Sequence, residues 1–430
     1  MPDIINTFGR AVDHLAPTNP AAARQLLLAG FRAIGAKFRY FPDKRLPSAR
    51  QYIAGEINRT VCRMLSCPEN VALTSVFMPC ELLHAMDITP MCAELYSAFI
   101  NGSDAEAVFA DAAEAEGIPE TYCSYHKVLL GCAYTGVLPA PRFIVNTSLV
   151  CDANNLTFRE LADFYQIPQY YVDVPPEHSN EAVDYVAGQL HELTAFLEDN
   201  TGRKLDEERL YETLVRSRDT TAALRACMRE KRCHTLPGDI TSEMYEIYMV
   251  HNGLGTPEAQ RYAGQLLADV QNAPPAHGLR LLWLHTIPIW QKPVRGLFNL
   301  SDRVQILACD MNLEGLVDID PSNPYDSMAR RLVYSRWNGG EERIAAAVEA
   351  AEIMNADGVI CFCHWGCKQT MGLSAVLKSE LEKAGFPTLI LNGDGCDRRN
   401  SSDGQTATRL NAFVEMLENE NHEQSCLLRL

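Results

Sequence analysis

The sequence lacks several features that would place the protein in a familiar class. It contains no C-x-x-C pair, which argues against a zinc ribbon and against a thioredoxin-like redox motif. It contains no G-x-x-x-x-G-K-[ST] loop, so any ATP hydrolysis must belong to a partner protein. No apolar run approaches the roughly 18 residues of a membrane span, and the first residues lack the basic start and apolar core of a secretory signal. We therefore expect a cytoplasmic protein without a membrane partner.

Basic residues are also scarce. The 430 residues include 38 Lys and Arg against 55 Asp and Glu, a formal net charge of −17. Because nucleic acids and anionic membranes bind clustered Lys and Arg, this balance predicts no nucleic-acid partner. A hydrophobic content of 47% in a chain of this length is typical of a globular protein with two or three domains.

Cysteine, by contrast, is abundant, with 15 residues in the chain. An odd number without a secretory signal does not favour a disulfide framework, since the cytosol keeps thiols reduced. Most of these cysteines are expected to be small buried hydrophobic residues. This interpretation is applied to Cys62, Cys67, Cys92, Cys132, Cys151, Cys227, Cys233, Cys309, Cys396 and Cys426.

Strand-like and helical segments alternate in two parts of the chain. "NVALTSVFMP" and "PRFIVNTS" are strand-like in the first part, and "VQILACDMN" and "FPTLILNGDG" in the second. Such alternation indicates mostly parallel α/β sheets. We predict an α/β fold with two Rossmann- or flavodoxin-like parallel-sheet domains, a helical segment between them and a helical N-terminus. The expected ranges are 1–60 (helical N-terminal segment), 61–178 (first α/β domain), 179–273 (helical segment) and 274–430 (second α/β domain).

The stretch "GVICFCHWGCKQTMG", residues 358–372, places three cysteines within seven residues. Cys361 and Cys363 lie two apart in the expected strand, so their side chains share one face of the sheet and are interpreted as core. Cys367 follows the strand and directly precedes an expected helix. Its position is therefore different from that of its two neighbours.

Two more cysteines occupy the same kind of position. Cys80 follows the strand-like "ALTSVFMP" and precedes a helix, and Cys123 in "TYCSYHK" begins another helical stretch. In open α/β sheets ligands bind beyond the carboxyl ends of the strands, and a helix N-terminus favours the thiolate form of cysteine. Cys80, Cys123 and Cys367 are therefore candidate ligands of a shared metal site, with buried packing as the alternative for each.

Four segments carry a family resemblance that covers roughly residues 60–430. They are "FMPCELLHAMDITPM", "CSYHKVLLG", "DGVICFCHWGCKQT" and "FPTLILNGDGCDRRNSSDGQTATRLNAFVEML". Together they resemble the 2-hydroxyacyl-CoA dehydratase D-component family. The resemblance implies a low-potential 4Fe-4S cluster held by three cysteines, which correspond by position to Cys80, Cys123 and Cys367, with Cys62 and Cys67 as substitutes for Cys80. Three thiolates would leave one iron open to substrate oxygen.

The resemblance also implies a reaction and its partners. The expected activity is that of an oxygen-sensitive (R)-2-hydroxyacyl-CoA dehydratase, a lyase working as a homo- or heterodimer with a related subunit. One electron from an ATP-dependent iron–sulfur activator would form a ketyl radical, which expels the α-hydroxyl group and then loses the β-proton. Four groups lie near the expected ligands in sequence, and none is assigned as the base: Glu81, His84, His126 and His364.

Other functions remain open from the sequence. A homodimeric reductase of small molecules would use the same cysteines for an 8Fe-9S double-cubane cluster, also driven by an ATP-dependent activator. A non-catalytic partner subunit would keep a cluster only for electron transfer. An α/β protein with many buried thiols and no metal is the simplest alternative. The acyl group of the substrate is not predicted.

Overall fold

The structure, a computed structural model, describes the backbone of residues 4–427 and the side chains of residues 4–420. Two four-stranded sheets form its framework, and all their strand pairs are parallel. The strand order is β2-β1-β3-β4 in the first sheet and β6-β5-β7-β8 in the second. The strands are Val71–Thr74 (β1), Thr89–Cys92 (β2), Phe143–Thr147 (β3), Gln169–Val172 (β4), Leu279–Leu284 (β5), Val304–Cys309 (β6), Gly358–His364 (β7) and Thr388–Gly393 (β8).

The two sheets share one topology. In each, the chain passes from the first strand to an edge neighbour and then crosses to the opposite side of the first strand. Connections therefore leave in opposite directions between β1 and β3, and again between β5 and β7. Such switch points open a crevice at the carboxyl ends of the strands, which is where α/β proteins bind ligands.

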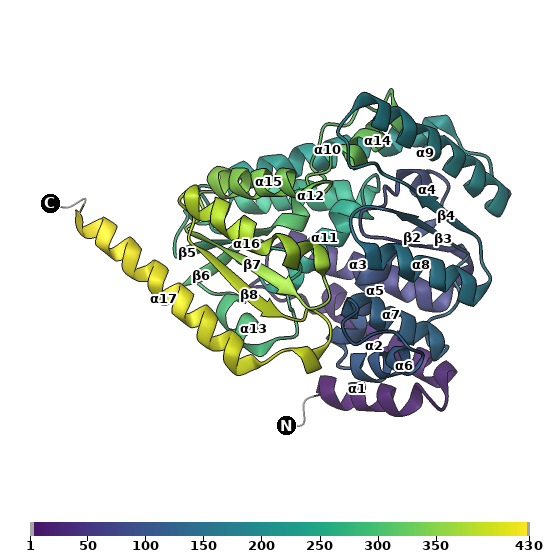
Figure 1. Ribbon diagram of the computed structural model, residues 1–430, viewed down its shortest axis with the longest axis horizontal. Helices are drawn as coiled ribbons and strands as arrows, with labels where there is room; N and C mark the ends of the chain where they lie inside the picture. The colour runs from purple at the N-terminus through teal and green to yellow at the C-terminus, as the bar shows by residue number, and fades with distance from the viewer. Residues whose placement is uncertain (1–3, 428–430) are drawn as a thin grey trace.

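The predicted fold class, two parallel α/β sheets with a helical N-terminus, is confirmed, while the residue limits of the four domains stay predictions. The N-terminal helices α1, α2 and α3 pack together beside the first sheet (Figure 1). Every residue of β1 and β3 is buried, as expected for strands covered by helices on both faces. The helices up to the end of the first half are Ile4–Leu15 (α1), Pro20–Tyr40 (α2), Ser48–Ser66 (α3), Glu81–Ala85 (α4), Ala93–Gly102 (α5), Glu106–Ala115 (α6), Ser124–Tyr134 (α7) and Asp152–Tyr165 (α8).

Four helices follow the first sheet in the chain, and one of them joins the two halves. Helix α11 contacts α3 on one side and β6 on the other, and it lies between the two sheets in Figure 1. Its inward residues include Met244 and Tyr248, both almost fully buried. The four helices are Asn180–Thr201 (α9), Glu207–Glu230 (α10), Ile240–His251 (α11) and Pro257–Gln271 (α12).

The second half repeats the sheet-and-helix arrangement around β7, whose seven residues are all buried. Its last helix, α17, runs out beyond the rest of the chain (Figure 1). The remaining helices are Lys292–Phe298 (α13), Pro324–Val333 (α14), Gly340–Met354 (α15), Lys368–Lys383 (α16) and Asp403–Leu427 (α17). Short 3₁₀ turns are Pro68–Asn70 (η1), Asp310–Asn312 (η2) and Arg398–Asn400 (η3).

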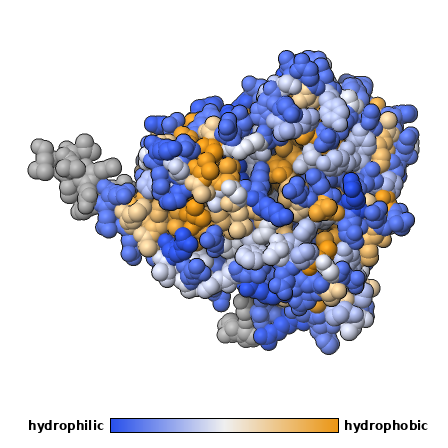
Figure 2. All heavy atoms as spheres, viewed as in Figure 1, coloured by the Kyte–Doolittle hydropathy of each residue, from blue (hydrophilic) through white to orange (hydrophobic). Residues whose placement is uncertain are grey.

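The surface is mostly polar, as the acidic composition requires. Figure 2 shows apolar side chains gathered over the second half, where α16 lies. Met371 and Val376 of this helix are among the exposed large hydrophobic residues. Within the described part of the chain, no helix has the length and apolar character needed to cross a membrane.

Candidate functional site

Three cysteines from the two halves meet at the crevice between the sheets. Cys151 follows β3 and is the N-cap residue of α8, and Cys367 follows β7 and is the N-cap residue of α16. Cys123 is the N-cap residue of α7, which packs against α8. All three thiols line one cavity of about 80 Å³, called here the thiol cavity.

The rest of the thiol cavity is largely apolar. Its walls include the aromatic rings of Phe77, Tyr125, Tyr248 and Trp337, and the side chains of Met244 and Met311. Three histidines and one carboxylate also line it: Glu94, His126, His285 and His364. Among the described residues, neither Lys nor Arg lines this cavity, so none of its described side chains supplies the permanent positive charge that would stabilise several thiolates.

Burial dominates the acidity of two of these thiols. It raises the pKa of Cys123 well above the usual range and the pKa of Cys151 to about 12. The neighbouring cysteines raise both further, since a second or third thiolate nearby would repel the first. Backbone N–H groups at the helix starts lower the pKa of both thiols, but by less than burial raises it. These thiols therefore stay neutral unless a cation or metal centre binds among them.

The predicted convergence of Cys80 with Cys123 and Cys367 is not found. Cys80 is fully buried, but it lies outside the thiol cavity. Its thiol donates to the Met78 carbonyl at 3.2 Å and accepts from Asn252 Nδ2 at 3.4 Å. The structure thus brings together two of the three predicted cysteines and adds Cys151, for which the sequence predicts buried packing.

Cys151 was missed although it carries the same local signal as Cys80. In "PRFIVNTSLVCDANN" the cysteine comes after a strand-like run and is followed by an acidic residue that begins a helix. The rule used for the other three cysteines applies to it unchanged. What the rule does not supply is the distance between the ends of different strands.

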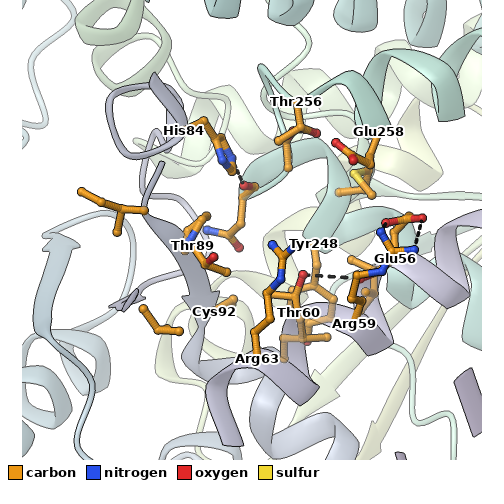
Figure 3. Close-up of a pocket in the computed structure, with 18 of the residues that line it drawn as sticks. Glu56, Arg59, Thr60, Arg63, His84, Thr89, Cys92, Tyr248, Thr256 and Glu258 are labelled. Atoms are coloured by element: carbon orange, nitrogen blue, oxygen red, sulfur yellow. Dashed lines mark hydrogen bonds and ion pairs between the residues drawn. The ribbon is translucent and has the colours of Figure 1, made fainter. Parts of the chain in front are cut away.

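Two further candidates lie around a separate hollow of about 540 Å³ (Figure 3). Cys67 lines this hollow, as does His84, whose Nε2 atom lies 2.8 Å from the Asn252 carbonyl. Cys62 is half-buried on α3 and lies outside the thiol cavity as well. Cys62 and Cys67, the two possible substitutes for Cys80, therefore lie outside the thiol cavity as well.

The imidazole of His364, which belongs to the second half of the chain, contacts the Cys123 sulfur. His364 Nε2 lies 3.4 Å from Cys123 Sγ, while His364 Nδ1 accepts from the Gly395 N–H at 3.0 Å. Because Nδ1 is the acceptor, the proton of the neutral ring is on Nε2, which donates toward sulfur. Burial lowers the pKa of His364 and so favours this neutral form. Cys367 also has a histidine neighbour, since His285 Nε2 lies 3.6 Å from Cys367 Sγ.

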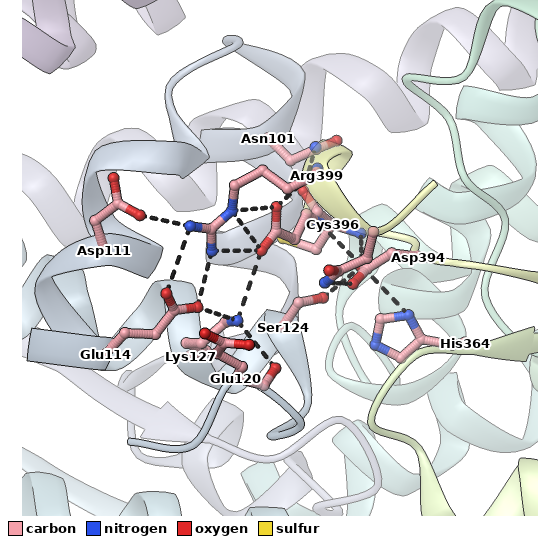
Figure 4. Close-up of polar contacts among 12 residues, drawn as sticks. Asn101, Asp111, Glu114, Glu120, Ser124, Lys127, His364, Asp394, Cys396 and Arg399 are labelled. Carbon is pink, nitrogen blue, oxygen red and sulfur yellow. Dashed lines mark hydrogen bonds and ion pairs between the residues drawn. The ribbon is translucent and has the colours of Figure 1, made fainter. Parts of the chain in front are cut away.

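A network of polar contacts joins the loop after β8 to the start of α7, where Cys123 lies (Figure 4). Asp394 Oδ1 accepts from Ser124 Oγ at 2.5 Å and from the backbone N–H of Cys396 at 2.8 Å. Ser124 is the residue after Cys123, so the loop that follows β8 is tied directly to the start of α7. Lys127 and Arg399 extend the network through ion pairs with Glu114, Asp111 and Asp397. The segment "LNGDGCDRRN" is thereby held against the start of α7, next to Cys123.

His126 and Glu94 form a second polar pair within the thiol cavity. His126 Nε2 lies 3.9 Å from Glu94 Oε1, and His126 Nδ1 has no hydrogen-bond partner among the described residues. Burial lowers the pKa of His126 to about 4 and raises the pKa of Glu94. A neutral imidazole with a free ring nitrogen is therefore available inside an apolar space.

The remaining cysteines mostly fit the packing interpretation. Cys361 and Cys363 are buried in the hydrophobic cluster between β7 and the helices α15 and α16, which confirms their assignment to the core. Cys92, Cys132, Cys227, Cys309 and Cys396 are buried as well, whereas Cys233 is exposed. The side chain of Cys426 lies outside the described residues.

The thiol cavity offers the type of donor atom that an iron–sulfur cluster needs. Within residues 4–420, no group of three His, Cys, Asp or Glu side chains could hold one metal ion. The three thiols instead surround a small apolar space from three helix starts. Soft thiolate donors are those that iron–sulfur clusters use, and a cluster would supply the positive charge that the walls lack. Cys123, Cys151 and Cys367 therefore fit as its ligands.

Comparison with known proteins identifies the family of the chain. A family model described as 2-hydroxyglutaryl-CoA dehydratase, D-component, matches residues 75–417. The chain belongs to this family. The match includes the whole thiol cavity, from Val76 to Gln369.

Three characterised relatives carry related names. The chain is 26% identical to the alpha subunit of (R)-2-hydroxyglutaryl-CoA dehydratase from Acidaminococcus fermentans, over 65% of this chain and 61% of that protein. It is 23% identical to the (R)-phenyllactyl-CoA dehydratase alpha subunit of Clostridium sporogenes, over 81% and 90% of the two chains. It is 22% identical to the lactoyl-CoA dehydratase alpha subunit of Anaerotignum propionicum, over 85% and 95%. The acyl groups in these names differ, so they indicate a shared type of substrate and not one compound.

Proposed function

We propose that this chain is the iron–sulfur subunit of an oxygen-sensitive (R)-2-hydroxyacyl-CoA dehydratase. The observation that carries the proposal is the meeting of Cys123, Cys151 and Cys367 around one apolar cavity without Lys or Arg in its walls. Family membership and the names of the relatives supply the type of reaction. The three thiolates replace the set Cys80, Cys123 and Cys367 that the sequence suggested.

The chain's own residues would prepare this cavity for a [4Fe–4S] cluster. When bound, such a cluster supplies one-electron chemistry and a coordination position not taken by a protein ligand. The Nε2–H of His364 donates to the Cys123 sulfur and helps to hold it in place. The aromatic and methionine side chains exclude water, which a radical reaction requires.

The elimination itself would begin with one electron from an ATP-dependent activator. This activator would be a separate protein, because the chain has no phosphate-binding loop of its own. The thioester would take up this electron as a ketyl radical anion, expel its α-hydroxyl group as hydroxide, lose a β-proton and give the electron back, which leaves the enoyl-CoA and water. His126 is suited to receive that proton, since its Nδ1 is unpartnered among the described residues and Glu94 stands beside it. His84 lies in a different hollow, and both ring nitrogens of His364 already have neighbours.

A partner subunit forms part of the proposal. The three relatives are named as alpha subunits, which supports pairing with a related, non-identical subunit. Activity of the chain with an activator alone would instead favour a homodimer. If the chain only transferred electrons to a catalytic partner, loss of the His126 imidazole would leave turnover unchanged.

Anaerobic purification followed by iron and sulfide analysis tests the cluster. We expect about four irons per chain, against about eight for a double-cubane cluster. With activator, ATP and partner subunit, the preparation should dehydrate a 2-hydroxyacyl-CoA, and exposure to air should abolish this activity irreversibly. A colourless, iron-free chain that remains fully active in air would contradict the proposal.

The base is tested by His126→Gln. We expect turnover to fall by about 10²–10⁴-fold, the usual contribution of a general base, while the iron content stays that of the wild type. His84→Gln is the matched control, because it changes the same residue type in the other hollow. Equal losses in both variants would show that neither residue acts at the thiol cavity.

A further inference from the structure

The thiol cavity is too small for a whole acyl-CoA, so most of the substrate must lie elsewhere. Its volume of about 80 Å³, part of which a cluster would fill, leaves room for no more than the reacting end of a thioester, whereas pockets for drug-sized ligands span about 300–1,000 Å³. A hollow of about 440 Å³ shares Val150, Trp337 and Gln369 with it but has no charged side chain in its described walls. Two larger hollows share α11 side chains with it. One is the hollow of Figure 3, of about 540 Å³, and the other is a groove of about 650 Å³ between α1, α2 and α5 on one side and α13 on the other.

The groove, called here the α13 groove, adjoins the thiol cavity. Met244 and Tyr248 of α11 line both spaces. Between these two residues and the outer rim the walls are aromatic and apolar. Phe99 packs edge-on against Phe31 at 5.4 Å and stacks on Tyr245 at 5.6 Å, and all three rings line the groove.

Cations are placed at the outer end of the α13 groove. Lys292 and Arg295 stand three residues apart on α13, so they lie on one face of that helix. Both side chains are exposed and have no hydrogen-bond or ion-pair partner among the described residues. A third cation, Arg398, is paired with Asp104 at 3.0 Å and lies over the ring of Trp290 at 5.3 Å.

The charges distinguish the groove from the hollow of Figure 3. Arg59 and Arg63 line that hollow together with three carboxylates, those of Glu56, Asp87 and Glu258, and Arg59 is already paired with Glu56 at 2.8 Å. The α13 groove has three cations against two carboxylates, Asp104 and Asp403. In a chain with a net charge of −17, a net positive groove that meets the thiol cavity is the better place for a polyanion.

We infer that the α13 groove binds the coenzyme A portion of the substrate, an inference that rests on the proposed function. Lys292 and Arg295 contact the phosphates of the adenosine 3′,5′-bisphosphate end, and Trp290 offers a ring for the adenine. The pantetheine arm lies along Phe31, Phe99 and Tyr245. The thioester then enters the thiol cavity past Met244 and Tyr248.

Calorimetric titration of the full chain with coenzyme A and with dephospho-coenzyme A tests this site. We expect the 3′-phosphate to strengthen binding to the wild type, and Lys292→Ala with Arg295→Ala to weaken coenzyme A by about 10-fold or more. The double variant should lose the preference for the 3′-phosphate. Since both side chains are exposed and unpartnered among the described residues, its melting temperature should match that of the wild type.

Arg59→Ala with Arg63→Ala is the matched control, with two cations removed from the other hollow and no expected effect on affinity. Weaker binding in this control and not in the α13 variant would overturn the inference, and so would a wild-type chain that binds no coenzyme A. Asp403→Asn, which removes a carboxylate from the groove, should strengthen binding. The chain could also bind coenzyme A in a way that depends on Lys292 and Arg295 and yet contain no iron and show no dehydratase activity. That result would support the groove as the coenzyme A site and refute only the proposed function.

Discussion

Two cysteines of the first sheet show how differently one local pattern can be used. Cys80 comes after β1 and Cys151 after β3, and each is the N-cap residue of a helix that begins with an acidic residue. Cys151 faces the thiol cavity with Cys123 and Cys367. Cys80 is instead enclosed beside Glu81, whose carboxylate forms two 2.6 Å bonds with Arg331. A thiol at a helix start is therefore a potential ligand, and its neighbours from other strands decide whether it becomes one.

The largest effect expected from this comparison concerns iron binding. Cys123→Ala, Cys151→Ala and Cys367→Ala should each lose most of the iron, because each removes one of the three proposed ligands. Cys80→Ala should retain the wild-type iron content, as measured on anaerobically purified protein. Iron loss in Cys80→Ala together with full retention in Cys151→Ala would restore the ligand set suggested by the sequence.

The region of Cys80 should matter for stability instead. Arg331→Met leaves the fully buried Glu81 carboxylate without its charged partner, which typically costs about 3–5 kcal/mol of unfolding free energy. Anaerobic denaturant unfolding measures this loss. Adding Glu81→Gln should recover part of it, because the unpaired charge is then removed. A loss below about 1 kcal/mol would mean that the ion pair contributes little.

A smaller effect is expected from the imidazole that donates to Cys123. His364→Phe should weaken cluster retention by about 10–100-fold, the usual cost of losing a hydrogen-bond partner of a metal ligand. The rate of iron release to a chelator measures this change without relying on activity. His84→Phe, which changes a histidine of the hollow in Figure 3 and not of the thiol cavity, is the control and should release iron at the wild-type rate.

The smallest effect is expected in the core of the second sheet. Cys361→Ala removes a buried thiol from the cluster between β7 and its helices and should cost about 1 kcal/mol of stability. Its iron content should equal that of the wild type, in contrast to Cys367→Ala only six residues away. Iron loss from Cys361→Ala would show that the two cysteines of the strand take part in the site.

Much of the fold could be read from residue patterns. The alternation in "PRFIVNTS" and in "VQILACDMN" predicted β3 and β6, and the apolar run before Cys367 predicted β7. The edge strand β2, in "TPMC", was not predicted, because four residues that include a proline give little strand signal. The family resemblance was likewise carried by short segments of sequence and agrees with the match over residues 75–417.

The sequence by itself determined the fold class, the abundance of thiols at helix starts and the acidic surface, because these depend on local periodicity and composition. Tertiary structure alone decided which thiols share a space. Strand order placed β1 and β3 side by side, yet the loop after β3 directs Cys151 into the crevice while Cys80 is enclosed against α11. Tertiary structure also brings Lys292 and Arg295 into one groove with Phe31 and Phe99. About 190 or more residues of chain separate α13 from those two rings. Distances between such segments are set by packing and leave no trace in the local pattern of either.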